Sequence, residues 1–259
     1  MSNLRNYQRV VSSKGRSDHT IDEGLRAYMI GVYNNMALGL VITGIVSFLV
    51  SALATTLDPS AASVALRNGI MLTDFGVALY TSPLAYVVMF APLGLCLFMQ
   101  VRLRYLSSSA LRTTFFIYAA LMGLSLSSIF LHYTNKSIVQ TFFICAASFG
   151  SLSLYGYVTK RDLTPLGSFM IMGVFGVMIA SLVNWFLKSP AMELAISIMG
   201  LIAFAGLTAY DTQKIKESYS EGYSTDDVNR SSIMGALMLY MDFIAMFMYL
   251  LRFMGQRRD

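Results

Sequence analysis

Long apolar stretches alternate with short polar ones along the chain, and this pattern predicts membrane-spanning helices. An α-helix rises ~1.5 Å per residue and the hydrocarbon layer of a bilayer is ~30 Å thick, so about 20 apolar residues cross it. The apolar blocks are too long for the strands of a membrane barrel, and they lack the strict alternation of such strands. We therefore predict an all-α membrane protein with seven transmembrane helices, at residues 28–54, 79–101, 111–131, 138–157, 166–187, 191–210 and 233–253.

Polar links separate these blocks, and none is long enough to form a soluble domain. The links at 134–137, 160–165 and 188–190 read as tight turns, whereas those at 56–78 and 212–232 are longer. We predict a polar, basic, cytoplasmic N-terminal tail of residues 1–27, a seven-helix transmembrane domain of residues 28–255 and a basic C-terminal tail of residues 256–259. The tail lacks the early apolar core of a cleavable signal peptide, so we expect the first helix to direct insertion.

The composition agrees with this membrane assignment. Hydrophobic residues make up 56% of the 259 residues and charged residues only 13%, about half of the share in soluble domains. The net charge of +5 comes from basic residues between the blocks, with no basic stripe interleaved with aromatics, so we expect no nucleic-acid partner. Cys96 and Cys145 both fall inside apolar blocks, where they are expected to pack as small hydrophobes.

The distribution of Lys and Arg predicts the orientation in the membrane. The N-terminal tail and the links after the second, fourth and sixth blocks hold most of these residues, so the N-terminus should be cytoplasmic. Seven spans then put the C-terminus outside, although Arg252, Arg257 and Arg258 favour the inside. Either the last block spans against its charge bias, or it is re-entrant. We favour a full span, since its length suffices to cross.

Two aspartates, Asp242 and Asp211, are the strongest candidates for chemistry. Asp242 lies in the middle of the last block, where a charge costs ~2.5–3.5 kcal/mol, so it should face the bundle interior and have a partner. A neutral, hydrogen-bonded aspartate that locks helix packing is the structural alternative. Asp211 closes the sixth block, and its structural alternative is a solvated residue at a helix end.

Brought together, the two carboxyl groups would titrate as a coupled pair. Without its proton the pair would attract Ca²⁺, which prefers oxygen ligands; with one shared proton it would hold two helices together. Asp242 is ~15 Å from the predicted start of its helix and Asp211 is shallower. The two meet if the sixth helix extends past Tyr210, which the amphipathic segment 211–219 would allow, or if the seventh is displaced. No cluster of acids resembles a calcium loop, so we predict weak Ca²⁺ binding and no cofactor.

Three segments carry a resemblance to a known family. Residues 206–215 read Gly-Leu-Thr-Ala-Tyr-Asp-Thr-Gln-Lys-Ile, which resembles the signature of the Bax inhibitor-1 family, the transmembrane BAX inhibitor motif proteins. Residues 237–252 are similar to the last helix of that family, and residues 123–133 to its third helix. The resemblance covers the chain from about Tyr28 onward, and the short tail and compact loops are similar to those of bacterial members.

The resemblance implies a fold in which six helices surround a central C-terminal helix. It also implies a pH-sensitive passive Ca²⁺ leak in the bacterial inner membrane, gated by an aspartate pair that Asp211 and Asp242 match. Ca²⁺, protons and membrane lipid would be the partners, and no enzymatic activity is expected. In some members an arginine on the second helix binds one of the aspartates; residues 79–101 contain none, and Arg102 is at the helix end. The residues expected to support the pair are Tyr210, Thr212, Gln213 and Tyr240.

Three other functions fit parts of the sequence. An intramembrane aspartyl protease would place its second aspartate in Gly-x-Gly-Asp, whereas this chain has Tyr240-Met-Asp242. A serine intramembrane protease needs a histidine base, but His132 ends the third block and no Gly-x-Ser-x-Gly occurs. The main alternative is a non-transporting regulator that binds a membrane protease or a stress or cell-death complex, because small residues in the spans favour close helix packing.

Overall fold

The fold is a bundle of long helices. The computed structural model of the chain describes the backbone of residues 2–56, 58–66, 69–102, 106–220 and 224–258, and side chains within these ranges from residue 23 onward except at residue 61. Within the described residues, seven helical segments are long and apolar enough to cross a membrane, which confirms the predicted architecture. They are α1 (Ser2–Ala54), α3 (Leu84–Arg102), α4 (Ser108–Leu126) with α5 (Ile129–His132), α6 (Asn135–Val158), α7 (Thr164–Leu187), α8 (Pro190–Glu217) and α9 (Thr225–Met254).

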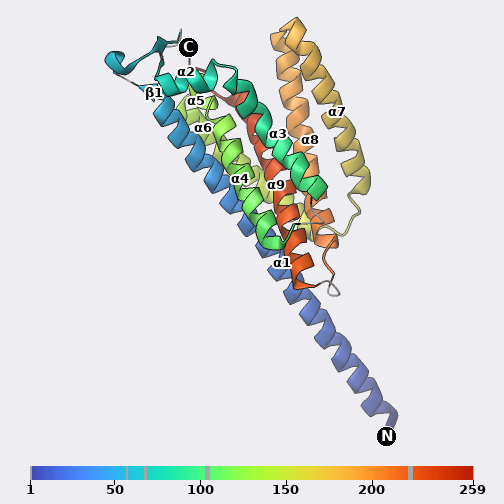
Figure 1. Cartoon of the computed structure of the whole chain (residues 1–259). Coiled ribbons are helices and arrows are strands. Elements are labelled where there is room, and N and C mark those ends of the chain that lie inside the picture. The colour runs from blue at the N-terminus through green and yellow to red at the C-terminus, as the bar shows by residue number, and fades with distance from the viewer. Residues whose placement is uncertain (1, 57, 67–68, 103–105, 221–223, 259) are drawn as a thin grey trace.

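The C-terminal helix α9 forms the centre of the bundle. It packs against α1, α4, α6 and α8, while α3 lies outside on α4 and α7 lies outside on α8 (Figure 1). The most apolar stretch of α9 is 67% buried, against at most 39% in any other span. The prediction of a central last helix is therefore confirmed, and four of the surrounding helices make the main direct contacts with it.

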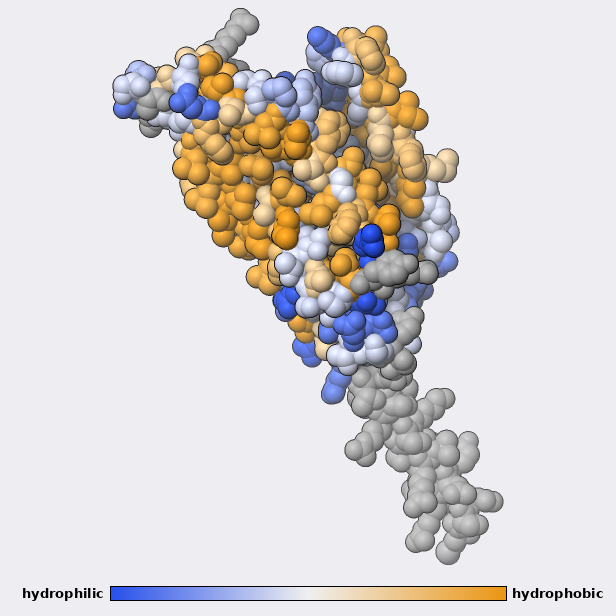
Figure 2. All heavy atoms as spheres, viewed as in Figure 1, coloured by the Kyte–Doolittle hydropathy of each residue, from blue (hydrophilic) through white to orange (hydrophobic). Residues whose placement is uncertain are grey.

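A broad apolar band surrounds the bundle between two polar ends (Figure 2). Large side chains such as Leu93, Phe143 and Ile179 are more than half exposed on α3, α6 and α7. In water such a surface would be a strong liability. In a bilayer the lipid chains cover it, and the helices satisfy their backbone polar groups internally. The protein is thus a multi-pass integral membrane protein.

The long link after α1 is folded. Strands β1 (Thr55–Thr56), β2 (Val64–Ala65) and β3 (Met71–Leu72) form a small antiparallel sheet in the order β1-β3-β2, and the 3-10 helix η1 (Pro59–Ala61) lies between β1 and β2. Helix α2 (Asp74–Tyr80) follows, and Thr73 caps it by accepting a 3.2 Å hydrogen bond from Gly76 N. The link carries more structure than its polar sequence indicates.

Two predicted helices are interrupted in the structure. The second was expected from residue 79, but α2 ends at Tyr80 and α3 begins at Leu84. Pro83 accounts for the break, because proline has no N–H donor and disfavours helical backbone in the residue before it. The third was expected as one helix over 111–131, but it is interrupted at Ser127, whose hydroxyl donates to Leu124 O at 2.6 Å.

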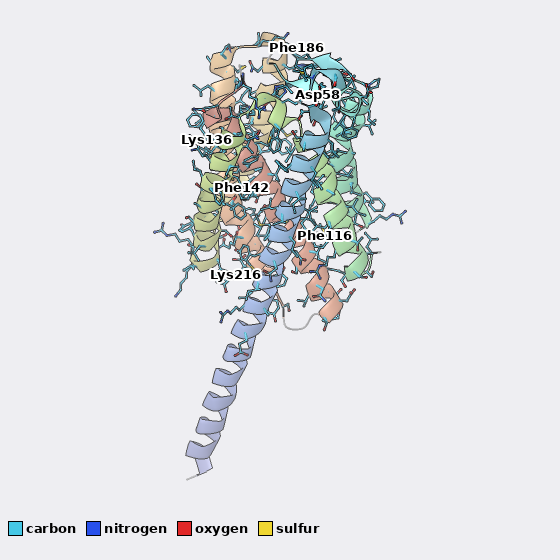
Figure 3. The ribbon with its side chains drawn as sticks, turned by 90° about the vertical axis from the view of Figure 1, so that its left-hand side faces the viewer. Asp58, Phe116, Lys136, Phe142, Phe186 and Lys216 are labelled. Carbon is cyan, nitrogen blue, oxygen red and sulfur yellow. The ribbon has the colours of Figure 1, made fainter. Side chains whose placement is uncertain are left out.

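The termini lie at opposite ends of the bundle (Figure 1), as a full span of α9 requires. At the C-terminal end the chain folds back on the start of α6: Thr134 N donates to Gln256 O at 3.1 Å, and Arg258 N donates to His132 O at 2.8 Å. Asp58 and Lys136 lie toward this end, whereas Lys216 lies toward the other (Figure 3).

Two arginines of the C-terminal segment have local partners. Arg257 donates to Glu193 at 2.6 Å, and this hydrogen bond raises the pKa of the arginine. Arg258 donates to Asn135 Oδ1 at 2.8 Å and to the carbonyl of Tyr133. Glu193 offsets the charge of Arg257, whereas the partners of Arg258 are neutral.

Candidate functional site

The two predicted aspartates meet where α8 packs on α9. Helix α8 continues past Tyr210 to Glu217, so Asp211 lies within a helix rather than in a link. This is the extension that a meeting of the two aspartates required. Helices α8 and α9 follow each other in the chain and share one of the most extensive contacts in the bundle.

The carboxyl groups of Asp211 and Asp242 lie within hydrogen-bonding range of each other. Asp242 is only 5% exposed, whereas Asp211 is half-buried. A hydrogen bond between two carboxyl groups requires a proton on one of them, because ionised carboxylates are acceptors only. Lys214, one turn further along α8, is the positive charge that acts on Asp211. A direct hydrogen bond within this pair would therefore depend on protonation of one of the two aspartates.

One oxygen of the pair has no partner. Asp242 Oδ2 is buried and makes no hydrogen bond to any described residue. An unpartnered buried acceptor of this kind costs free energy unless water, a proton or a cation satisfies it. Within the described residues no third His, Cys, Asp or Glu joins the two carboxyl groups. Since Ca²⁺ takes 6–8 oxygen ligands, the pair supplies only part of a Ca²⁺ coordination shell.

Tyr240 points to the opposite side of α9. Its hydroxyl lies 2.6 Å from Thr43 Oγ1, which in turn lies 2.8 Å from the carbonyl oxygen of Ala119. The ring makes edge contacts with Phe115 and Tyr118 of α4. Tyr240 therefore joins α9 to α1 and α4, and it does not contact the aspartates.

Thr212 belongs to a chain of three hydroxyl groups on three helices. Tyr33 Oη of α1 lies 2.6 Å from Ser153 Oγ of α6, which lies 2.9 Å from Thr212 Oγ1 of α8. Thr212 then donates to Thr208 O at 2.7 Å, so the chain ends on a backbone acceptor. Sequence reasoning missed Tyr33 and Ser153. Polar residues within the first apolar block, including Asn35, were the available signal.

Tyr210 and Gln213 face the α6–α7 connection. The Tyr210 ring packs so closely on Gly167 that a Cβ there would lie 2.4 Å from it. Gln213 accepts from Leu163 N at 2.8 Å and donates to Arg161 O at 2.8 Å. Of the four residues predicted to support the pair, none makes a hydrogen bond to either aspartate.

Known proteins resemble this chain over nearly its whole length. A family model described as "Inhibitor of apoptosis-promoting Bax1" matches residues 25–259. The chain belongs to the Bax inhibitor-1 family. The Rickettsia prowazekii protein RP147 is 43% identical over 98% of this chain and 99% of its own length. The Escherichia coli inner membrane protein YbhL is 39% identical over 94% of this chain and 98% of its own length. The similarity to these Bax inhibitor-1 relatives therefore extends through nearly the whole membrane domain.

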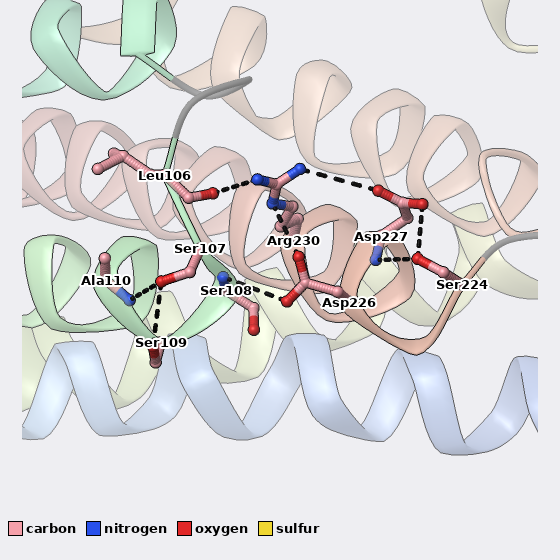
Figure 4. Close-up of polar contacts among 9 residues, drawn as sticks. All are labelled: Leu106, Ser107, Ser108, Ser109, Ala110, Ser224, Asp226, Asp227 and Arg230. Atoms are coloured by element: carbon pink, nitrogen blue, oxygen red, sulfur yellow. Dashed lines mark hydrogen bonds and ion pairs between the residues drawn. The ribbon is translucent and has the colours of Figure 1, made fainter.

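In this Bax inhibitor-1 protein Arg230, at the start of α9, forms a network of polar contacts that does not reach the aspartate pair. Arg230 pairs with Asp226 at 3.2 Å and with Asp227 at 3.8 Å, and it donates to the carbonyl of Leu106 (Figure 4). Asp226 in turn accepts from Ser108 N at 3.4 Å. This network ties the α3–α4 connection to α9.

Proposed function

We propose that the protein is a passive, pH-sensitive leak for Ca²⁺ or related cations, with Asp211 and Asp242 as its gate. The observation that carries this proposal is the buried pair itself, in which one oxygen of Asp242 lacks a partner. A charge in a membrane span is costly, and such residues generally mark ion or proton pathways.

The gate would depend on the proton that the two carboxyl groups share. With the proton in place, a hydrogen bond between Asp211 and Asp242 holds α8 on α9. Without it, two negative charges repel each other, loosen this helix contact and attract a cation. Flux should therefore rise as the pH rises. The absence of further acidic ligands supports weak binding, which a leak needs because the ion must also leave.

The proposed location is the bacterial inner membrane, with the N-terminus in the cytoplasm. The relative YbhL is described as an inner membrane protein. The basic links near Lys216 and Arg230 favour the cytoplasmic side for the end of the bundle at which α1 enters it.

The decisive experiment is Ca²⁺ flux into liposomes that contain the purified protein, measured between pH 5 and pH 8. Wild type is compared with the double variant Asp211→Asn, Asp242→Asn, whose amides keep the shape and hydrogen bonding but not the charge. The matched control is Asp58→Asn, Asp162→Asn, which removes two exposed carboxylates outside the spans. We expect pH-dependent flux in wild type and control, and none in the folded double variant.

The same experiment separates the leak from the alternative function. If wild type gives no flux above empty liposomes, the leak is refuted. A non-transporting regulator, which binds a membrane protease or a stress complex, then becomes the better explanation. If the folded double variant keeps the wild-type pH response, the aspartates are packing residues and the gate lies elsewhere.

A further inference from the structure

Helices α1 and α6 flank α9 on one side of the bundle but hardly contact each other. In Figure 3 α1 runs in front, with Phe142 of α6 beside it. Two hollows open between these helices. One lies toward the C-terminal end of α1 and has a volume of about 560 Å³; the other lies nearer Arg26 and has about 550 Å³. The hydrogen bond between Tyr33 and Ser153 is the polar link across this side.

The hollow near Arg26 is mainly apolar and faces the bilayer. Ile30 and Leu154, from α1 and α6, line it and are 48% and 62% exposed. Gly150 widens it, because a Cβ built on this residue would meet nothing within 4 Å. At this depth the surrounding medium is lipid, so an acyl chain is what fills such a space.

Positive charge gathers at the mouth of this hollow. Arg26 lines it and makes no ion pair with another described residue, including Glu23 one turn earlier on α1. Lys216 does not line the hollow, but it donates at 2.8 Å to the carbonyl oxygen of Tyr157, which does, and it lies 5.3 Å from the centre of that ring. Among the residues whose side chains are described, no acid lines the hollow. An anionic headgroup complements this arrangement, since a Lys or Arg near an anionic membrane surface is worth ~1 kcal/mol.

The other hollow offers an internal comparison. It is lined by apolar residues such as Val139 and Phe247, with only Thr43 and Ser47 as polar members, and no charged residue borders it. It can take an acyl chain but has no group that selects a headgroup.

We propose that the hollow near Arg26 is a binding site for one anionic phospholipid. Its phosphate lies against Arg26, and one acyl chain lies between Ile30 and Leu154. Tyr33 and Ser153 line this hollow. Their hydroxyl groups connect it through hydrogen bonds to Thr212, the residue next to Asp211.

The test measures lipid binding directly and does not depend on ion flux. Trp185, the single tryptophan, is replaced by phenylalanine, and Leu154→Trp places a reporter in the hollow. Vesicles contain brominated phosphatidylglycerol or brominated phosphatidylcholine, whose bromine atoms quench a tryptophan that they contact. We expect about fivefold preferential quenching by phosphatidylglycerol, the equivalent of the ~1 kcal/mol of one cation.

Variants identify the groups responsible. Arg26→Gln should bring the preference to about one, and Gly150→Leu should reduce quenching by both lipids because its side chain fills the hollow. Gly176→Leu on α7, another glycine with open space around its Cβ, is the matched control and should change neither. A reporter at Val139→Trp in the uncharged hollow should show no preference.

Three outcomes would overturn the proposal. No preference in wild type, or a preference that survives in Arg26→Gln, removes the headgroup site. An equal preference at Val139→Trp means that anionic lipid is enriched around the whole protein rather than bound at this place. Circular dichroism of each variant in detergent verifies that it is folded, so each of these results bears on the lipid site itself.

Discussion

Two polar residues two positions apart on α9 have opposite environments. Tyr240 faces α1 and α4, is fully buried, and its hydroxyl is satisfied at 2.6 Å by Thr43. Asp242 faces α8, is nearly as buried, and keeps one oxygen without a partner. The aromatic rings of Phe115 and Tyr118 close the first site, whereas the second holds another carboxyl group, that of Asp211.

The difference separates a residue that serves helix packing, Tyr240, from a candidate functional residue, Asp242, on the same helix. A satisfied buried group rigidifies a fold, while a partly satisfied one costs stability and persists where it serves another purpose. Helix α9 thus has one face whose buried polar group is fully hydrogen-bonded and another whose titratable carboxyl group is only partly hydrogen-bonded. The predictions below challenge this contrast.

The largest effect is expected at Asp242. Asp242→Ala should abolish the pH response of Ca²⁺ flux, and Asp211→Asn should weaken it, because the deeper carboxyl group is removed only in the first variant. Asp242→Asn should lose the pH response while its free energy of unfolding changes by less than about 1 kcal/mol. Flux assays and unfolding titrations in detergent test both. An unchanged flux in Asp242→Ala would mean that Asp242 serves helix packing rather than gating.

A large structural effect is expected at Gly156, where α6 approaches α8. A Cβ at this position would lie 2.1 Å from the carbonyl oxygen of Ala209, two residues before Asp211. Gly156→Ala should therefore push α8 aside and lower the free energy of unfolding by about 1–3 kcal/mol. Gly150→Ala on the same helix has open space and should be neutral or slightly stabilising. Equal stability of the two variants would mean that α6 and α8 are not held this closely.

Tyr240→Phe should have the reverse signature of Asp242→Asn. Loss of the hydroxyl removes one buried hydrogen bond, so the free energy of unfolding should fall by about 1 kcal/mol. The pH response of flux should stay as in wild type, because the tyrosine does not contact the aspartates. A Tyr240→Phe protein with altered pH response would break the distinction between the two faces.

Arg230→Gln should give a smaller loss. Its ion pairs with Asp226 and Asp227 are partly exposed, and such pairs are worth about 0.2–1 kcal/mol. The backbone near Ser108 should exchange amide hydrogens faster, since the tie to α9 is lost. Arg161→Gln removes an exposed charge that forms no ion pair with a described residue and serves as control. Identical exchange in the two variants would show that the Arg230 network does not hold the connection.

The smallest effect concerns Asp162 in the α6–α7 link. The hydroxyl and the backbone N–H of Thr164 hold the pKa of this exposed carboxyl group below its usual value. A lowered pKa in the folded state stabilises above the unfolded value of ~3.9, and this contribution is lost as the pH falls through the folded value. Asp162→Asn should therefore be slightly less stable than wild type at pH 7, and the difference should be smaller at pH 3. A constant difference between the two pH values, measured by unfolding titration, would contradict this.

The local hydrophobic pattern was sufficient to predict most of the helices, but it did not predict where they are interrupted. The spans α6 and α7 lie within three residues of the predicted blocks, because hydrophobic length is a property of the segment itself. Helix α9 ends within one residue of its predicted block but begins eight residues before it. The break before Leu84 was readable in principle from Pro83. The interruption at Ser127 was not, because it coincides with a tertiary hydrogen bond from Tyr80 Oη to Ser127 Oγ at 2.9 Å.

For the candidate site, the two aspartates could be identified from the sequence, but the residues that contact their neighbours could not. The motif around Asp211 also suggested Tyr210 and Gln213, which contact the α6–α7 connection instead. Successive helical residues are rotated by about 100°, so neighbours in sequence face different helices. Tyr33 and Ser153 reach Thr212 from α1 and α6, far away in the chain.

The sequence by itself determined that this protein spans a membrane, how many helices it uses, and which acids are costly there. These properties follow from the length and polarity of each segment against a slab of fixed thickness. Only the tertiary structure decided that α8 runs on past Tyr210 and brings Asp211 to Asp242, and that α1 and α6 stay apart beside Arg26. Those outcomes depend on how far each helix continues and how it is rotated against its neighbours, and packing of the whole bundle sets both.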